Sequence, residues 1–160
     1  MPTSHTSSVA NRPPTLTRAW APDLDTDRLY ALLKLRVEVF VVEQAWFYPE
    51  LDGYDLLPRT RHFWVEREGA VIGTVRLLEE TEVGMRQYRL GHLCTRRTDR
   101  GYGHTTRLLQ AALADVGEAP CRIDSPSYLV EMYTRHGFVQ SGEEQIDNGV
   151  PLVPLLRNQR

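Results

Sequence analysis

The chain has 160 residues, of which 41% are apolar and 25% are charged, and its formal net charge is -2 at pH 7. This length suits one domain with a core and is short for two, and the charge gives no electrostatic footprint for nucleic acid. No apolar run approaches the ~20 residues that span a bilayer, and the polar N-terminus lacks the apolar centre of a secretory signal. We therefore expect a cytoplasmic protein without a membrane or nucleic-acid partner, with a flexible tail over residues 1–15 and a single domain over 16–160.

The first half of the domain is predicted to contain a helix, a loop and a hairpin. Apolar residues recur at helical spacing over 29–44, after capping side chains at 25–27, although the valine-rich end of this stretch favours strand. An aromatic and acidic loop follows over 45–60, and loops of this kind carry function on a rigid scaffold. Residues 62–66 and 71–79 are typical of two strands around a short turn, which predicts a hairpin.

The second half alternates strands and helices. Its predicted elements are a strand over 88–96, a helix that ends near Asp115, a strand over 121–124, a helix over 128–136, and strands over 138–139 and 150–156. Gly91 can mark a bulge or a close approach, and the prolines of the last strand indicate an edge. This order predicts an α/β fold with a mixed sheet flanked by helices, in which 88–96 and 121–124 run parallel.

Two cysteines are present, Cys94 and Cys121, and both lie in apolar, strand-like settings. Buried reduced thiols are typical of such positions, and they agree with a cytoplasmic location. No cluster of His, Cys and Asp has the spacing of metal ligands, so we expect no metal.

The most informative segment is a turn with two glycines between a predicted strand and a predicted helix. Glycines one residue apart let the backbone bend sharply and approach a ligand without interference from Cβ. The helix that follows directs its first N–H groups at the turn, which favours phosphate, and an arginine adds a guanidinium. We therefore predict a site for a phosphorylated ligand, formed by Arg100, Gly101, Tyr102, Gly103, His104 and Thr105.

Three kinds of phosphate site compete for this turn. A P-loop needs a Lys followed by Ser or Thr, and the turn has no Lys. A dinucleotide site has its first two glycines in Gly101 and Gly103 but Thr106 in the place of the third. An antiparallel hairpin precedes the turn and the chain is short for two mononucleotide-binding halves, yet this alternative stays open. The third kind is a site for the pyrophosphate of coenzyme A.

The turn and the order of elements resemble the GNAT N-acetyltransferases. The fingerprint of that family is Arg or Gln, two residues, Gly, one residue, and then Gly or Ala. Arg100, Gly103 and Thr105 stand at these places, and Thr105 is a departure from the pattern. Residues 132–138, which read MYTRHGF, are similar to the family's second signature, an aromatic residue, Tyr, three residues, Gly and Phe.

The resemblance is closer to one branch, the ElaA-like acetyltransferases. The segments that carry it are 29–44, the DGYD sequence at 52–55, Arg61-His62 and the NGVP sequence at 148–151, so it covers about residues 29 to 157. In that branch a His tends to follow the last Pro, where this chain has Leu152.

The resemblance implies a mixed, mostly antiparallel sheet in which one parallel strand pair is splayed to hold acetyl-CoA. It implies that main-chain groups of Leu93, Cys94 and Thr95 bind the pantetheine and the thioester, while 100–105 hold the pyrophosphate. It also implies direct attack of an amine on the acetyl carbonyl in a ternary complex, with Tyr133 giving a proton to the leaving thiolate.

The acceptor side is less defined by sequence. Glu43 is our candidate catalytic proton acceptor, and Asp52, Asp55 and His62 lie in or beside the same surface and could equally relay the proton through water. Asp52 and Asp55 would attract a cationic amine, so with His62 they are our candidate substrate-binding residues. The identity of the amine and the presence of a homodimer stay open.

The sequence therefore predicts an N-acetyltransferase that uses acetyl-CoA as cosubstrate and an amine as acceptor. A non-catalytic acyl-CoA-binding sensor or interaction module on the same fold is the alternative, because a fold does not fix a function.

Overall fold

The computed structural model describes residues 12–158. Its main elements, in chain order, are strand β1 (Thr15–Trp20), helix α1 (Thr26–Arg36), π-helix η3 (Val37–Glu43), strands β2 (Arg61–Arg67), β3 (Ala70–Glu82) and β4 (Met85–Thr95), helix α2 (His104–Val116), strand β5 (Cys121–Pro126), helix α3 (Val130–Thr134), and strands β6 (Val139–Gln140), β7 (Gln145–Asp147) and β8 (Val150–Arg157). Short 3-10 turns are η2 (Ala21–Asp23), η4 (Tyr54–Leu56), η5 (Arg97–Asp99) and η6 (Ser127–Leu129).

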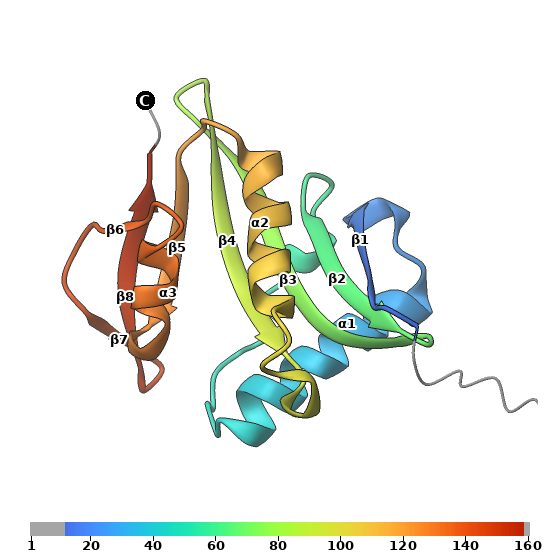
Figure 1. The fold of residues 1–160 in the computed structure, drawn as a ribbon. Helices are drawn as coiled ribbons and strands as arrows, with labels where there is room; N and C mark the ends of the chain where they lie inside the picture. The colour runs from blue at the N-terminus through green and yellow to red at the C-terminus, as the bar shows by residue number, and fades with distance from the viewer. Residues whose placement is uncertain (1–11, 159–160) are drawn as a thin grey trace, which may run out of the picture.

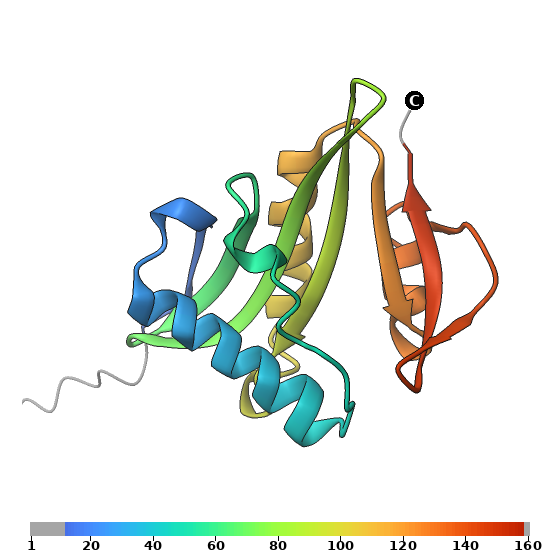
Figure 2. The same cartoon turned by 180° about the vertical axis from the view of Figure 1, so that it is seen from behind.

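The strands form one mixed sheet, as predicted. Their order is β1-β2-β3-β4-β5-β8-β6, and β7 pairs with β8. Within the described residues β4 and β5 are the one parallel pair, and the other pairings are antiparallel. Helices α2 and α3 cover one face of the sheet and α1 covers the other (Figures 1 and 2). The α/β class of the prediction is therefore confirmed.

Helix α1 begins at the predicted cap. The Asp25 carboxylate accepts a hydrogen bond from the main-chain N–H of Arg28 (2.7 Å), which satisfies one of the free donors of the first turn. The predicted helix over 29–44 then changes, because its valine-rich end forms the π-helix η3. Such wide turns are rare and occur frequently at functional sites.

Helix α2 is fixed to the sheet by its apolar face. Leu108 and Leu109 are fully buried against β3 and β4, in one core with Val75 and Leu90. Gly73 of β3 lets the helix approach, because a Cβ at that position would lie 3.1 Å from Leu108 Cδ1. Close packing of α2 on β3 therefore fixes the helix, and with it the glycine turn at its start. A larger residue at position 73 would disturb this packing.

The parallel strands β4 and β5 separate after a short ladder. Their register pairs Tyr88 with Cys121 and Arg89 with Arg122. Past these residues β4 continues beside β3 up to Thr95, and β5 continues beside β8 up to Pro126. The two strands diverge visibly in both views (Figures 1 and 2), so the splayed pair of the prediction is confirmed.

A bulge interrupts β4 at the point of divergence. Thr74 of β3 pairs with Cys94 and Arg76 pairs with Gly91, so two residues of β4 face one residue of β3. The first of the two, His92, has φ of 54°, which is the left-handed region that non-glycine residues rarely adopt. The bulge expected from Gly91 is thus present at the residue that follows it.

Three features of the sheet differ from the predictions. Strands β1 and β7 were not predicted. Of the predicted tail, residues 1–11 lie outside the described residues. The prediction of an edge for residues 150–156 is wrong, because β8 pairs with β5 on one side and with β6 and β7 on the other. The carbonyl of Pro154 accepts from Ser141 N–H (2.9 Å) in the break between β6 and β7. In an antiparallel strand the N–H and the C=O of one residue point to the same side. The N–H that Pro154 lacks would therefore point into the break between β6 and β7, where no strand hydrogen bond is lost.

Both cysteines are buried free thiols, as expected. Burial raises the pKa of each to about 12, so neither is a ready nucleophile. Among residues 12–158, no helix combines the length and the apolarity needed to cross a bilayer.

Candidate functional site

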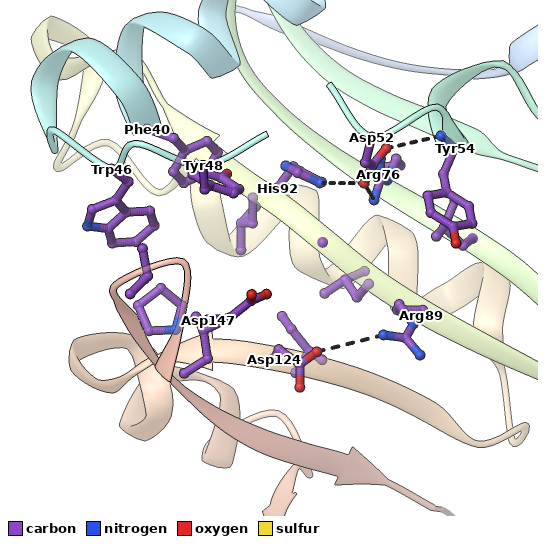
Figure 3. Close-up of a pocket in the computed structure, with 18 of the residues that line it drawn as sticks. Phe40, Trp46, Tyr48, Asp52, Tyr54, Arg76, Arg89, His92, Asp124 and Asp147 are labelled. Atoms are coloured by element: carbon purple, nitrogen blue, oxygen red, sulfur yellow. Dashed lines mark hydrogen bonds and ion pairs between the residues drawn. The ribbon is translucent and has the colours of Figure 1, made fainter. Parts of the chain in front are cut away.

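A cavity of about 430 Å³ lies where β4 and β5 diverge. One wall comes from the loop over 45–60 together with β3 and β4, and the other comes from β5, α3 and the β7–β8 hairpin. Figure 3 shows His92, Asp52 and Arg76 on the first wall and Asp124 and Asp147 on the second. Its aromatic end is formed by Phe40, Trp46 and Tyr48, whose rings pack on one another.

The glycine turn leads from the end of β4 into α2. Gly101 and Gly103 have φ of 87° and 82°, and a Cβ on either would meet no atom within 4 Å. These glycines therefore provide a left-handed backbone and an open surface. No side chain caps α2 and its first turn has no acidic residue, so its first N–H groups and the positive end of its dipole stay available to an anion.

Thr105, the departure from the GNAT fingerprint, is turned inward. Its hydroxyl shares a hydrogen bond with the Thr95 hydroxyl, with 2.9 Å between the oxygens. This contact ties the first turn of α2 to the end of β4. The structure thus accommodates the hydroxyl beneath the turn.

Asp99 stiffens the turn from below, and sequence reasoning missed it. Its carboxylate is buried and accepts from Arg96 Nε (2.6 Å), from Arg67 (2.9 Å) and from the Thr98 hydroxyl (3.1 Å). Burial alone would raise the pKa of Asp99, but these hydrogen bonds and the two guanidinium charges lower it. The anchor joins the turn to β2 through Arg67.

Arg100 and Glu43, predicted as a phosphate ligand and as a catalytic group, form a pair with each other. The Arg100 guanidinium donates to both Glu43 oxygens (2.7 and 2.5 Å), and its Nε donates to the carbonyl of Thr95 (3.1 Å). The hydrogen bond from Arg100 lowers the pKa of Glu43. Glu43 is at the end of η3 and is not among the residues that line the cavity. The structure brings it to the glycine turn instead.

Tyr133 lies on α3 with its side chain in the cavity wall. It is 2% exposed, and its ring packs edge-on against Phe138, with 5.6 Å between the centroids. Burial raises the pKa of its hydroxyl, so the phenol stays protonated at neutral pH and is suited to give a proton.

The three predicted acceptor residues occupy different depths. Asp52 lines the cavity and accepts two hydrogen bonds from Arg76 (2.8 and 2.9 Å). Asp55 lies behind it, 5% exposed, and accepts from Arg36 (2.5 Å) and from Arg76 (3.2 Å). His62 is 1% exposed, with a ring nitrogen 3.0 Å from the Asp55 carbonyl oxygen. Of the three, only Asp52 reaches the cavity.

These carboxylates belong to a larger buried network, which we call the ion cluster. Glu50 is 3% exposed and accepts from Arg36 Nε (2.5 Å) and from the Tyr48 hydroxyl. His92 Nδ1 lies 2.8 Å from a Glu50 oxygen, and its Nε2 lies 3.6 Å from Asp52 Oδ2. The members of the ion cluster are Arg36, Glu50, Asp52, Asp55, Arg76 and His92.

Sequence reasoning missed four of these six residues. One signal for Arg36 is present in the sequence, because it lies four residues after Leu32 and four before Phe40, on the apolar stripe of the predicted helix. Arg76 similarly interrupts an apolar strand. A charged residue at a core position is rarely unpaired, so both arginines indicate buried carboxylate partners. Nothing in the sequence singles out Glu50 or His92.

We expect Asp55→Asn to destabilise the fold. The substitution keeps the shape of the side chain but leaves Arg36 and Arg76 with less negative charge in a buried site. Breaking a buried ion pair costs about 3–5 kcal/mol, and urea unfolding at pH 7 measures this loss. Asp23→Asn, on an exposed residue, is the control and should change stability by less than about 0.5 kcal/mol. A loss below about 1 kcal/mol for Asp55→Asn would contradict a structural role for the cluster.

The pH dependence of this effect has a defined sign. Burial would raise the pKa of Asp55, but the hydrogen bond and charge of Arg36, followed by those of Arg76, lower it. Its stabilisation is therefore complete above the unfolded pKa of about 3.9 and is lost as pH falls toward the folded value. The difference between wild type and Asp55→Asn should shrink when the urea titrations are repeated at pH 3.

The comparisons with known proteins agree with this geometry. The family model described as "Acetyltransferase (GNAT) domain" matches residues 36–157. A UPF0039 protein of Mycobacterium tuberculosis is 61% identical over 143 residues, which are 89% of this chain and 92% of that protein. Protein ElaA of Escherichia coli is 27% identical over 139 residues, 84% of this chain and 90% of ElaA.

Solved structures show the same fold. An acyl-CoA N-acyltransferase from Pseudomonas aeruginosa superposes with a TM-score of 0.84 at 32% identity, covering 91% of this chain and 99% of its own. The crystal structure of Escherichia coli ElaA gives a TM-score of 0.83 at 25% identity, with coverage of 91% and 99%. The chain therefore belongs to the GNAT acetyltransferase family, as an ElaA-like member.

Proposed function

We propose that this chain is an N-acetyltransferase that moves the acetyl group of acetyl-CoA to an amine by direct attack in a ternary complex. The observation that carries the proposal is the junction of three features at one place. The parallel strands open there, the uncapped glycine turn lies at the end of β4, and a protonated buried tyrosine lines the cavity between the strands. Family membership supports acyl transfer, and the geometry supports the finer assignment.

The pantetheine and the thioester would lie along the end of β4. Leu93, Cys94 and Thr95 follow the last residue of β4 that pairs with β5, so an extended ligand can take the place of a neighbouring strand there. Main-chain groups on that side would form its hydrogen bonds, as in strand addition.

The pyrophosphate would bind at residues 100–105, through the N–H groups of the glycine turn and the Arg100 guanidinium. In the free protein Glu43 occupies that guanidinium, and both side chains are partly exposed, 43% and 24%. An exposed ion pair contributes about 0–1 kcal/mol, so a diphosphate can displace it at small cost. We propose that Glu43 acts at this end, by holding Arg100 in place.

The chemistry would occur in the cavity. Positioning the amine against the thioester carbonyl supplies much of the rate, and Tyr133 would give its proton to the thiolate as the C–S bond breaks. The cavity lining holds four acids, Asp52, Glu80, Asp124 and Asp147, against two arginines, Arg76 and Arg89, and this excess of negative charge favours a cationic acceptor. Asp55 and His62 would act indirectly, by fixing Arg76 and the loop behind Asp52. Two reduced, buried thiols are in keeping with the proposed cytoplasmic location.

The test is thiol release from acetyl-CoA in the presence of primary amines. The panel contains ethylamine, 2-phenylethylamine, putrescine, lysine amide and a short peptide with a free N-terminus. We expect amine-dependent release with at least one of them, and mass spectrometry should show the acetylated amine. Tight acetyl-CoA binding by calorimetry without release from any amine would instead support the non-catalytic sensor.

Arg100→Ala should weaken the binding of acetyl-CoA. A charge-assisted hydrogen bond to phosphate contributes about 1.5–3 kcal/mol, so calorimetry should show Kd raised by roughly 10- to 100-fold. Arg86→Ala, an exposed arginine on the β3–β4 hairpin, is the matched control and should leave Kd unchanged. Glu43→Gln should bind acetyl-CoA at least as tightly as wild type and keep its turnover, whereas a large loss of kcat would return Glu43 to the catalytic step.

Tyr133→Phe should slow turnover without weakening cosubstrate binding. Loss of a positioned proton donor lowers kcat by about 10²- to 10⁴-fold, while the Kd of acetyl-CoA stays within about twofold because the ring and its packing remain. Tyr88→Phe is the control, since Tyr88 is equally buried but does not line the cavity. An unchanged kcat for Tyr133→Phe would remove Tyr133 from the mechanism.

A further inference from the structure

His92 occupies a strained position in the wall of the cavity. Its φ of 54° puts a non-glycine residue in the left-handed region, at the bulge of β4 that follows the last pairing with β5. A left-handed non-glycine residue stores backbone strain and persists only where its surroundings hold it, and bulges next to functional sites re-aim a side chain. Figure 3 shows the resulting orientation: the imidazole of His92 points from β4 toward Asp52 on the same wall of the cavity.

The imidazole is held in one orientation. Its Nδ1 lies 2.8 and 3.0 Å from the two oxygens of Glu50, and its ring packs edge-on against Phe40, 6.2 Å between centroids. Glu50 is itself fixed by Arg36 and by the Tyr48 hydroxyl. With Nδ1 at Glu50, the other ring nitrogen, Nε2, lies on the Asp52 side, 3.6 Å from Asp52 Oδ2, so a cation that approaches Nε2 also meets that carboxylate. The side chain is 13% exposed, so a ligand in the cavity can reach it.

The charges around His92 are unbalanced by one. The residues that face it directly are Glu50 and Asp52 of the loop and Phe40 of η3, and Arg36 of α1 and Arg76 of β3 lie behind the two carboxylates. With Asp55, the ion cluster holds three carboxylates and two guanidiniums. Elsewhere in the cavity lining Arg89 pairs with Asp124 (3.7 Å) and Glu80 (3.3 Å), and Asp147 adds a further negative charge. One further cation, either an ammonium group or an imidazolium, would balance the cluster.

We propose that His92 is the catalytic group that takes the proton from the acceptor ammonium, with Glu50 as its positioning residue. This inference rests on the proposed acetyltransferase function. A proton that passes from the ammonium to Nε2 leaves the total charge of the cavity unchanged, because one cation replaces another beside the same carboxylates. The transfer therefore avoids the cost of creating a new buried charge.

The proton balance of the reaction is complete. The first ammonium proton passes to His92 Nε2, and the freed lone pair forms the N–C bond to the acetyl carbonyl. As the C–S bond breaks, the thiolate takes the proton of Tyr133, and the second amine proton restores the tyrosine. The products are the amide and free coenzyme A, and the imidazolium returns its proton to solvent after they leave.

His92→Asn tests the proposal. Asparagine tolerates the left-handed backbone better than most residues, so the bulge can persist without the imidazole. The probes are the most active primary alkylamine of the panel and the same amine with two fluorines on its β carbon, which is much less basic. We expect kcat/KM for the basic amine to fall by about 10²- to 10⁴-fold. We also expect the acid limb of its pH profile, where an enzyme group must lose a proton, to disappear.

The fluorinated amine separates a catalytic role from a structural one. At about pH 8.5 it is largely unprotonated and needs no base, so His92→Asn should lower its kcat/KM at that pH by less than tenfold. His136→Asn, a histidine outside the cavity, should leave both amines unaffected, and calorimetry with acetyl-CoA and thermal unfolding report whether the variant is folded. Glu50→Gln should lower kcat/KM for the basic amine more than for the fluorinated one, because it weakens the contact that orients the imidazole.

Two results would overturn the assignment. An equal loss with both amines would make His92 a structural residue, and an unchanged acid limb with a rate within twofold of wild type would exclude it as the proton acceptor. Both results leave the acetyltransferase function intact. Absence of release with every amine by wild type would instead overturn the proposed function, and with it this inference.

Discussion

The rest of the site depends on the ion cluster that ties the loop over 45–60 to the sheet. Arg36 enters it from α1 and Arg76 from β3, and between them they bind carboxylates at 50, 52 and 55. Buried charges are costly to desolvate and are tolerated only when their hydrogen-bonding groups are paired. The loop over 45–60 forms no strand, so hydrogen bonds of a sheet do not fix its position. The buried ion pairs fix it instead, because few positions of the loop would pair all of these charges. One wall of the cavity therefore has a fixed shape.

Two departures from regular sheet then give the cavity its chemical groups. Because β5 leaves β4 after Arg89, the end of β4 has main-chain groups free on that side. The bulge that follows places the His92 imidazole in the cavity wall beside Glu50 and Asp52. A regular β4 would pair fully with its neighbours and would leave no room for a ligand. The ion cluster and the bulge also support each other, since Glu50 binds the imidazole that the bulge presents. The strain at His92 is thus offset by contacts made only in that conformation.

Much of the fold could be predicted from the sequence because its signals are local. The start of α1, the glycine turn and the helix after it each follow from residues close together in sequence, and the parallel strand pair follows from the order strand, helix, strand. The ion cluster could not be predicted in this way, because its partners are far apart in sequence, as Glu50 and His92 are, and charge alone does not say which acid meets which base. Asp55 and His62 illustrate the limit. Their types suit a substrate site, but both are buried and neither lines the cavity. Strand β1 is short and half-exposed, so its pattern was too weak to detect.

The two ends of the site use ion pairs of opposite kinds, and the difference suits their tasks. Arg100 and Glu43 are partly exposed, so water and salt weaken their attraction and the pair is worth about 0–1 kcal/mol. Under the proposed function, such a pair would keep the guanidinium in place until a diphosphate arrives and would then give way. Arg36 and its carboxylates are almost wholly buried, and separating them would cost several kcal/mol. That end cannot exchange partners during a reaction cycle, so it is fitted to hold the wall of the cavity while substrates come and go.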